Sequence, residues 1–395
     1  MPLRGSAGLV PAPGPRVAML HGRADPAHDG VADYTRRLVE ALRGAGTEVV
    51  DVPLDPGAAG ALRAARTVRG AGVDVVHLQF APSAFGFSGW PGLLLGDLIG
   101  TRPLVTTVHE YGWWSWAPRV PAALWSPCER RRLLDRETGR LVPRSAAVIT
   151  TNAEHEGALR DRFPAARLHR LPIPPNVTVV PDPDGAGRAA ARARWSLPDD
   201  AEVVAFFGFV HPVKGVRYLV DALAELAEER PGLRLLAVGG FTSLALPADE
   251  AAAFREELTA HVAAAGVTDR VVITGHLPAA EVSAALAAAD LAALPFTAGA
   301  TTKSGALLAT LDHGLPTIVT RRPDQEPDGE LVDGKTVVVA PAVRDAGILA
   351  TALRRLLEDP GLAARVGAGG RELLAGRDWT TLAGRHRDVY AEVCR

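Results

Sequence analysis

Short apolar segments alternate with longer amphipathic segments along this chain, and the whole alternation occurs twice. The apolar segments of the first half are residues 16–20, 47–52, 73–78, 103–109 and 146–150. Those of the second half are residues 202–208, 233–240, 270–275, 290–296 and 316–320. Continuous apolar strands separated by helices are typical of a parallel sheet that is covered on both faces. The sequence therefore predicts an α/β fold with two Rossmann-like, doubly wound parallel-sheet domains.

Helical patterns fill the gaps between the predicted strands. Apolar residues recur at near-helical spacing after the first strand, at Val31, Tyr34, Leu38 and Leu42. Further helices are expected at 216–229, 248–265 and 279–289, and three more after Val343. The proline-rich segment 171–187 interrupts helix and central strand alike, so it is expected to connect the domains. We expect a flexible tail at 1–15, domains at 16–175 and 176–378, and a C-terminal helix at 379–395 that crosses back to the first domain.

Composition limits the classes of partner. With 395 residues the chain has room for two domains, and its net charge of −2 gives no general field that would attract nucleic acid or an anionic membrane. We expect no nucleic-acid partner and no strong membrane signal. The two cysteines, Cys128 and Cys394, give no disulfide framework, and no apolar run approaches the ~20 residues that span a bilayer. A cytoplasmic location is therefore expected.

The chain has few lysines, and two of them lie in loops that follow predicted strands. Lys214 follows the strand at 202–208 and precedes Gly215, where a helix is expected to begin. A lysine at this edge of a parallel sheet can reach a phosphate as a mobile point charge. The alternative is a solvated side chain on a surface loop.

The stretch 300–305 separates another predicted strand from a helix and is rich in hydrogen-bond donors. The stretch contains Thr301, Thr302, Lys303, Ser304 and Gly305. A helix start offers free backbone N–H groups and a positive dipole end, so anions bind there. Capping alone would explain one Thr or Ser, but it would not explain the whole cluster. We predict that this stretch binds a diphosphate.

The segment from Gly329 to Thr336 matches the phosphate-loop pattern G-x4-G-K-[ST], but its context differs from that of a phosphate loop. The motif requires a buried strand before it and a helix after it. Here the acidic PDQEPD precedes it and the strand-like VVVAP follows. The sequence instead favours a turn at Asp333 and Gly334.

The first half has its own candidates at the ends of strands. His109 ends the strand at 103–109, where its ring can hydrogen-bond to a sugar hydroxyl; the alternative is a structural histidine beneath a packed lid. Weaker candidates for acceptor binding are His77, Gln79, Glu110, Tyr111, Trp113 and Trp114. Gly30 opens the helix after the first strand, where it can either let backbone N–H groups approach a phosphate or serve as a helix cap.

Taken in order, these motifs resemble those of the retaining family 4 glycosyltransferases, which have the two-Rossmann-domain (GT-B) fold. The motifs are DGVADYTRRL, DVVHLQF, TTVHEYG, GFVHPVKG, ITGHLPAAEV, DHGLPTIVT and the segment around Trp379. Each is weak alone, but their order and spacing cover nearly the whole chain. The resemblance implies that His109 contacts the transferred sugar. It also implies that Lys214 grips the donor diphosphate and that Gly30 lies near it.

The resemblance also implies that His276 and Leu277 lie near the nucleotide base, and that the last helix braces the first domain. The chain departs from the family pattern beside the diphosphate. Phe209 stands where an arginine is usual, and Thr301 and Ala309 stand where two glutamates are usual. We expect Lys303 to replace the arginine and to clamp the diphosphate together with Lys214. Ribose contact must then come from elsewhere, with Asp312 and Glu326 as weak candidates.

The resulting prediction is a retaining glycosyltransferase that moves a hexose, of the glucose or N-acetylglucosamine type, from a nucleotide diphosphate sugar to an acceptor hydroxyl. UDP is expected from family frequency, and the acceptor is a small molecule or a glycan. The only D-x-D sequence, Asp182 to Asp184, falls in the linker, so neither a metal nor another cofactor is expected. Three alternatives stay open: a sugar-nucleotide epimerase or phosphorylase, a silent sugar-nucleotide binding protein, and a dinucleotide dehydrogenase. The last lacks a G-x-G-x-x-G after the first strand.

Overall fold

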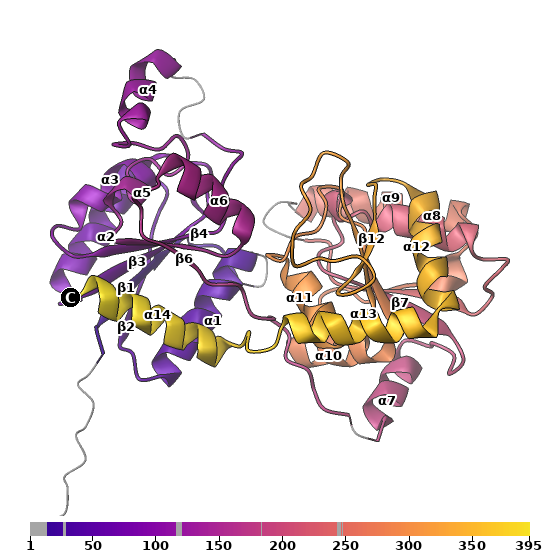
Figure 1. Cartoon of the computed structure of the whole chain (residues 1–395). Coiled ribbons are helices and arrows are strands. Elements are labelled where there is room, and N and C mark those ends of the chain that lie inside the picture. Colours follow the sequence, from indigo (N-terminus) through magenta and orange to yellow (C-terminus); the bar gives the residue numbers. More distant parts are fainter. Residues whose placement is uncertain (1–13, 27–28, 116–120, 183, 243–245, 247) are drawn as a thin grey trace, which may run out of the picture. The chain divides into compact units, whose positions relative to one another are not determined.

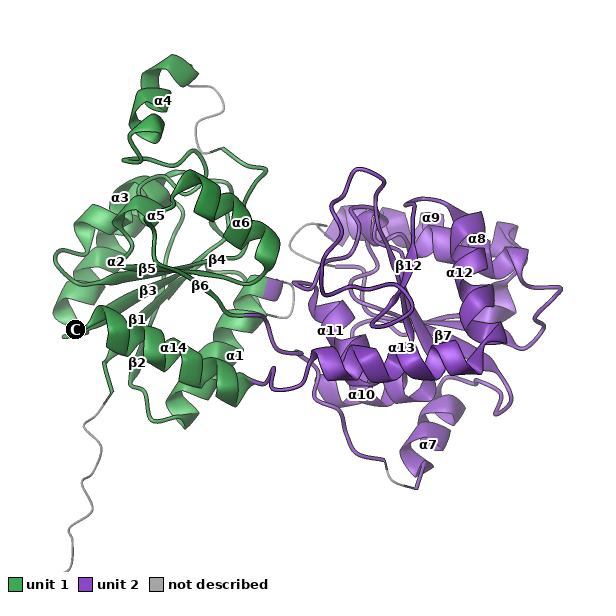
Figure 2. Cartoon of the chain, viewed as in Figure 1, with its two compact units in different colours: residues 1–26, 31–171, 379–395 green, residues 27–30, 172–378 purple. Residues whose placement is uncertain are grey.

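The computed structural model describes residues 14–26, 29–115, 121–182, 184–242, 246 and 248–395, which form two compact units. The first unit contains residues 1–26, 31–171 and 379–395, and the second contains residues 27–30 and 172–378 (Figure 2). The division falls a few residues before the expected boundary at 175. Residues 1–13 of the expected tail lie outside the described residues.

The first unit is a six-stranded parallel sheet with helices on both faces (Figure 1). The strand order is β2-β1-β3-β4-β5-β6. The strands are β1 (Val17–His21), β2 (Val49–Pro53), β3 (Val75–Phe80), β4 (Leu104–Val108), β5 (Ala147–Thr150) and β6 (Leu168–Arg170). The helices are α1 (Gly30–Gly44), α2 (Ala58–Gly70), α3 (Trp90–Leu98), α4 (Ala122–Arg130), α5 (Leu141–Arg144), α6 (Ala153–Arg162) and α14 (Trp379–Val393), with a 3-10 turn η1 (Ser83–Phe85).

The second unit repeats this architecture, with strand order β12-β11-β10-β7-β8-β9. The strands are β7 (Glu202–Phe207), β8 (Leu233–Val238), β9 (Val271–Ile273), β10 (Leu291–Leu294), β11 (Thr317–Thr320) and β12 (Val338–Ala340). The helices are α7 (Ala186–Arg194), α8 (Val216–Glu225), α9 (Ala248–Ala264), α10 (Ala279–Ala288), α11 (Gly305–Asp312), α12 (Ala346–Glu358) and α13 (Pro360–Leu373), with 3-10 turns η2 (Pro212–Lys214) and η3 (Thr268–Arg270). The predicted pair of doubly wound parallel sheets is confirmed.

The strands form where the sequence is apolar on both faces, because helices cover both sides of each sheet. All residues of β3, β4 and β10 are buried. Burying one Val or Leu side chain stabilises the fold by about 1.5–3 kcal/mol, so these central strands dominate each core. β6 escaped prediction because Leu168–Arg170 is short, polar and at the sheet edge.

The segment that matches the phosphate-loop pattern forms a turn, as expected. Gly334 has a left-handed φ of 69°, and its N–H donates to the carbonyl oxygen of Val337 at 2.8 Å. β12, not a helix, follows. Among the described residues, no helix combines the length and the apolar composition that crossing a bilayer requires.

Candidate active site

The second unit places two lysines at the carboxyl ends of neighbouring strands. β7 and β10 are paired and parallel, so the loops that follow them emerge at the same edge of the sheet. Ligands of doubly wound sheets bind at this edge. Lys214 ends η2, in the loop after β7, and Lys303 lies in the loop after β10.

The residue after Lys214 has a backbone conformation and surroundings that only glycine fits. Gly215 has a left-handed φ of 72°, and a Cβ there would lie 2.0 Å from the carbonyl oxygen of Pro295. The N–H of Thr297 donates to the carbonyl oxygen of Val213 at 2.9 Å. This bond ties the loop after β7 to the loop after β10, which fixes where Lys214 can point.

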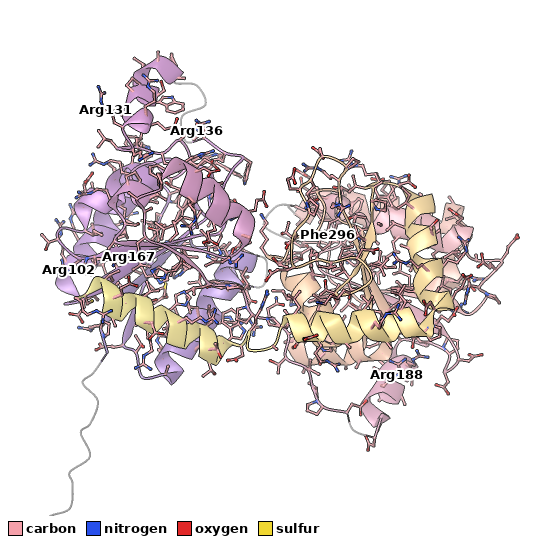
Figure 3. The ribbon with its side chains drawn as sticks, in the orientation of Figure 1. Arg102, Arg131, Arg136, Arg167, Arg188 and Phe296 are labelled. Atoms are coloured by element: carbon pink, nitrogen blue, oxygen red, sulfur yellow. The ribbon has the colours of Figure 1, made fainter. Side chains whose placement is uncertain are left out.

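The ammonium of Lys214 is half-buried and sits over an aromatic face. Its Nζ lies 4.2 Å from the ring centroid of Phe296, which is labelled in Figure 3. Burial lowers the pKa of Lys214, and the positive charge of Lys303 lowers it further. Within the part of the chain that the structure describes, no carboxylate forms an ion pair with either lysine. Two ammonium groups close enough to repel each other favour the binding of an anion.

The loop that contains Lys303 is fastened to the segment after β11. The N–H of Ala300 donates to the carbonyl oxygen of Thr320 at 2.9 Å. The N–H and the hydroxyl of Thr302 both donate to Oδ2 of Asp328, at 3.2 and 3.1 Å. The side chain of Lys303, the next residue, is exposed.

These bonds correct one expectation for the donor-rich stretch. Thr302 is buried and both of its donors are used by Asp328, so it is not available to a diphosphate. Ser304 is the N-cap of α11, where its Oγ accepts from the N–H of Leu307 at 3.4 Å, although its hydroxyl proton stays available. The helix begins at Gly305, so residues 301–304 form a loop. The groups that stay candidates for anion binding are Thr301, Lys303, Ser304 and the backbone at Gly305.

The other predicted donor contacts are spread along the second sheet. His276 is exposed and Leu277 half-buried, and both follow β9, two strands from β7. Glu326 is exposed beside a hollow of about 330 Å³ in the segment after β11. Asp312 lies in the last turn of α11, about 10 Å along the axis from the helix start, because each residue adds about 1.5 Å. Asp312 thus lies at the opposite end of this helix from Lys303, and its contact with the ribose stays a prediction.

In the first unit, His109 follows β4 and faces inward with one ring nitrogen. Its Nε2 lies 2.8 Å from Oε1 of Gln79, and the ring of Tyr34 packs edge-on against it at 4.9 Å between centroids. Only 7% of His109 is exposed. Burial lowers the pKa of His109 to about 3, so the imidazole is neutral near pH 7.

His77 and Gln79 were predicted to contact the acceptor, and the structure corrects this expectation. Both are fully buried, so neither offers surface to a ligand. His77 instead lies 2.8 Å from the hydroxyl of Thr107 and 2.7 Å from the hydroxyl of Tyr390 on α14. The two residues belong to the polar core beneath His109.

A carboxylate that sequence reasoning missed organises the loop after His109. Oε2 of Glu137 accepts from the backbone N–H groups of Gly112, Trp113 and Trp114, at 2.6, 3.1 and 3.3 Å. Its Oε1 accepts from Nη1 of Arg162 at 2.7 Å. Glu137 is buried, so this charge is held by hydrogen bonds rather than by water.

The aromatic side chains of this loop divide into buried and exposed ones. Tyr111 is buried, which removes it from the expected acceptor contacts. Trp113 is 61% exposed and packs edge-on against exposed Phe87 at 6.0 Å between centroids. Glu110 accepts from the hydroxyl of Ser83 at 3.0 Å.

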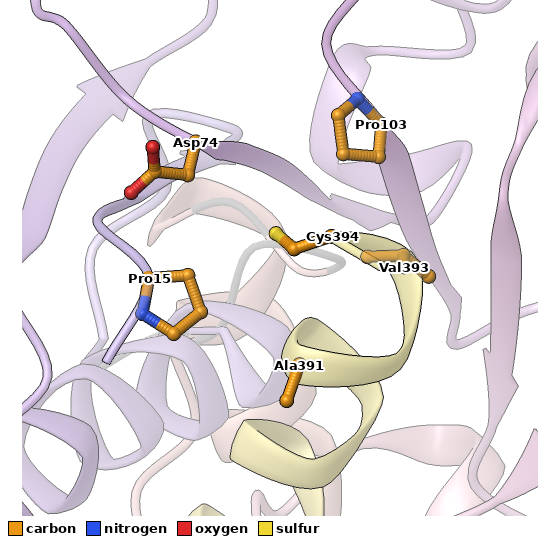
Figure 4. Close-up of a pocket in the computed structure, with 6 residues that line it drawn as sticks. All are labelled: Pro15, Asp74, Pro103, Ala391, Val393 and Cys394. Carbon is orange, nitrogen blue, oxygen red and sulfur yellow. The ribbon is translucent and has the colours of Figure 1, made fainter. Parts of the chain in front are cut away.

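A cavity of about 430 Å³ in the first unit lies at the other end of the sheet (Figure 4). Its lining consists of Pro15, Asp74, Pro103, Ala391, Val393 and Cys394. The first three precede β1, β3 and β4, so the cavity sits at the amino ends of the strands. Ligands of such sheets bind at the carboxyl ends, and we assign no ligand to this cavity.

Comparison with known proteins decides the family. A family model described as Glycosyl transferases group 1 matches residues 201–359. A GDP-mannose-dependent alpha-(1-6)-phosphatidylinositol monomannoside mannosyltransferase from Mycolicibacterium smegmatis is 33% identical over 75% of this chain and 72% of that protein. The chain belongs to the group 1 glycosyl transferases. The predicted family is thereby confirmed.

One further relative supports the same assignment, and one solved structure shares the fold. A D-inositol 3-phosphate glycosyltransferase from Segniliparus rotundus is 32% identical over 53% of this chain, but the match covers only 44% of that relative. A sucrose-phosphate synthase from Thermosynechococcus elongatus superposes with a TM-score of 0.71 over 96% of this chain and 98% of that one, at 21% identity. This likeness establishes the GT-B fold.

Proposed function

We propose that this glycosyl transferase moves a hexose from a nucleotide diphosphate sugar to an acceptor hydroxyl, with retention of the anomeric configuration. The observation that supports it is the pair formed by Lys214 and Lys303. Both follow neighbouring strands of one sheet, each lacks an acidic partner among the described residues, and they repel each other. A diphosphate would neutralise both charges at once, and the start of α11 adds backbone donors.

Transfer develops negative charge on the leaving diphosphate while the sugar becomes oxocarbenium-like. Cations that are already in place stabilise that charge more than they stabilise the ground state. Removal of one such donor typically costs about 2.7–4 kcal/mol, or 10²–10³ in kcat. His109, which is neutral, serves in this proposal as a hydrogen-bond partner for a hydroxyl of the transferred sugar.

The nucleotide and the acceptor that this protein prefers can be identified by binding and activity assays. UDP was expected from family frequency, whereas the mannosyltransferase from Mycolicibacterium smegmatis uses GDP-mannose. A thermal-shift panel of UDP- and GDP-hexoses ranks the donors, because a ligand that binds only the folded state raises Tm. D-inositol 3-phosphate is a reasonable first acceptor, because the relative from Segniliparus rotundus is named for it.

The decisive experiment compares single alanine variants of the three lysines. Lys214→Ala and Lys303→Ala are expected to lower kcat by about 10²–10³, because each removes one donor to the diphosphate. Lys335→Ala is the matched control, since Lys335 lies exposed beside the turn at Gly334 and should keep wild-type turnover. Wild-type rates in both site variants would end the proposal.

The same assay separates the other activities. Incubation with donor alone would give an epimerised or hydrolysed sugar if the chain were an epimerase or a hydrolase, and added phosphate would give a sugar phosphate if it were a phosphorylase. A silent binding protein would bind donor in calorimetry and form no product with any acceptor. Thr301 and Ala309, at the positions of the usual glutamates, keep these tests necessary.

A further inference from the structure

A row of buried polar side chains lies beneath His109 in the first unit. Gln79 and His77 are on β3, and Tyr390 is on α14; all three are fully buried. Oε1 of Gln79 lies 2.8 Å from Nε2 of His109, and Nε2 of Gln79 lies 3.2 Å from Nε2 of His77. Nδ1 of His77 lies 2.7 Å from the hydroxyl of Tyr390. Because buried polar groups are matched donor to acceptor, the row fixes where the ring protons sit.

The amide of Gln79 determines both histidines at once. Its oxygen can only accept and its nitrogen can only donate. Nε2 of His109 must therefore hold a proton, which it donates to Oε1 of Gln79. Nε2 of His77 must hold none, because it accepts from the amide nitrogen, and the proton of His77 lies on Nδ1 instead. The two neutral rings are thus coupled in opposite tautomers.

One neighbour favours this orientation of the amide over its reverse, and a second neighbour is compatible with it. The amide nitrogen lies 3.3 Å from Sδ of Met19, a weak acceptor, and the reverse orientation would place the carbonyl oxygen against the sulfur lone pairs. The hydroxyl of Thr107, 2.8 Å from Nε2 of His77, is free to donate to that unprotonated nitrogen. The sulfur contact therefore favours a proton-free Nε2 on His77, and the hydroxyl of Thr107 is compatible with it.

We propose that Gln79 is a positioning residue that holds His109 with Nε2 protonated and directed inward, and with Nδ1 left as an acceptor at the surface. None of the described residues donates to Nδ1 of His109, and 7% of the residue's surface is exposed. The assignment of the tautomer stands on the free protein. Only its use, acceptance of a bond from a hydroxyl of the transferred sugar, rests on the proposed function.

The test is a long-range 1H–15N correlation spectrum of the histidine-labelled free protein at pH 7.5. Ring nitrogens with and without a proton differ widely in shift, and spectra of His109→Gln and His77→Gln assign the signals. The expected result is Nε2–H in His109 and Nδ1–H in His77. The same tautomer in both rings would overturn the coupling, and the reversed pair would overturn the assigned direction.

A second variant tests the amide itself. Gln79→Glu keeps the shape but offers acceptors to both rings, so His109 is expected to stay Nε2–H while His77 changes to Nε2–H. Gln325→Glu, at the other glutamine of the chain, is the control and should leave both patterns unchanged. A His77 that keeps Nδ1–H in Gln79→Glu would contradict the proposal. If this variant does not fold, the spectrum of the wild-type protein alone decides the tautomers. Neither experiment contains a sugar nucleotide, so a failure of the proposed transfer reaction would not affect the result.

Discussion

Removal of the Glu137 side chain should loosen the aromatic loop after His109 and destabilise the first unit. Glu137 is buried, its Oε2 accepts three backbone N–H bonds at 2.6, 3.1 and 3.3 Å, and its Oε1 accepts from Arg162 at 2.7 Å. Loss of one partner from a buried pair leaves the other charge uncompensated, which costs about 3–5 kcal/mol. Asp135 lies 3.4 Å from the same Nη1, so the guanidinium keeps one weak partner and the lower end is expected.

Native-state hydrogen exchange measures this in the first unit without interference from the second. In Glu137→Ala the amides of Gly112, Trp113 and Trp114 are expected to lose protection, because their acceptor is gone. The amides of β4 should report a free energy of unfolding lower by about 3 kcal/mol. Glu137→Gln, which keeps an acceptor but not the charge, should fall between this variant and the wild type.

Glu129→Ala is the matched control. Glu129 pairs with Arg136 at the surface, at 2.8 Å, and such pairs contribute about 0.2–1 kcal/mol. If Glu137→Ala loses no more stability than Glu129→Ala and the three amides stay protected, the carboxylate does not hold the loop and this account of it is wrong.

Three further predictions test other parts of the structure. Burial lowers the pKa of His109 to about 3 and that of His386 to about 4, so the unfolded chain binds their protons first as pH falls below 6.5. Between pH 7.5 and 5.5 this difference should lower the free energy of unfolding, measured with urea, by about 1.4 kcal/mol for each histidine. A His386→Gln variant that loses as much stability as the wild type over this pH range would contradict the prediction. Gly215→Ala should lower stability by about 1–3 kcal/mol and weaken nucleotide binding, because φ is 72° and a carbonyl oxygen would lie 2.0 Å from the new Cβ. Gly384→Ala is the control, because its new Cβ would meet nothing within 4 Å, and equal Tm values for the two variants would refute the strain. Thr302→Val removes a hydroxyl bond to a carboxylate and should cost about 1.5–3 kcal/mol; wild-type unfolding and nucleotide affinity would show that this bond does not order the loop.

The strands were predictable because strands that are buried on both faces require continuous apolar runs in the sequence. β7 and β8 begin where the sequence placed them, and α8, α9 and α10 begin at the expected residues. The start of α11 was not predictable from composition. The run 301–304 resembles a helix start, but a carboxylate 26 residues later, Asp328, binds Thr302 and keeps the run in a loop.

Site residues were predictable as far as their place along a strand determines their edge of the sheet. Lys214 and Lys303 lie together for that reason. Burial was not readable in the same way, since His77 and Gln79 alternate with apolar residues on a strand that is covered on both faces. Glu137 left no periodic signal, because its partners are backbone groups 23–25 residues earlier in the chain.

The buried hydroxyl that meets His77 arrives on α14, the last helix of the chain, whose inner face also buries Leu382, Ala383 and Val389. The amino-terminal sheet therefore lacks one of its covering helices while the ribosome is still translating, although all of its strands emerge early. The nascent chain must complete the second unit before the first can close. Premature termination within the last helix would expose a histidine and its apolar neighbours to chaperones and proteases, even though every strand would be present.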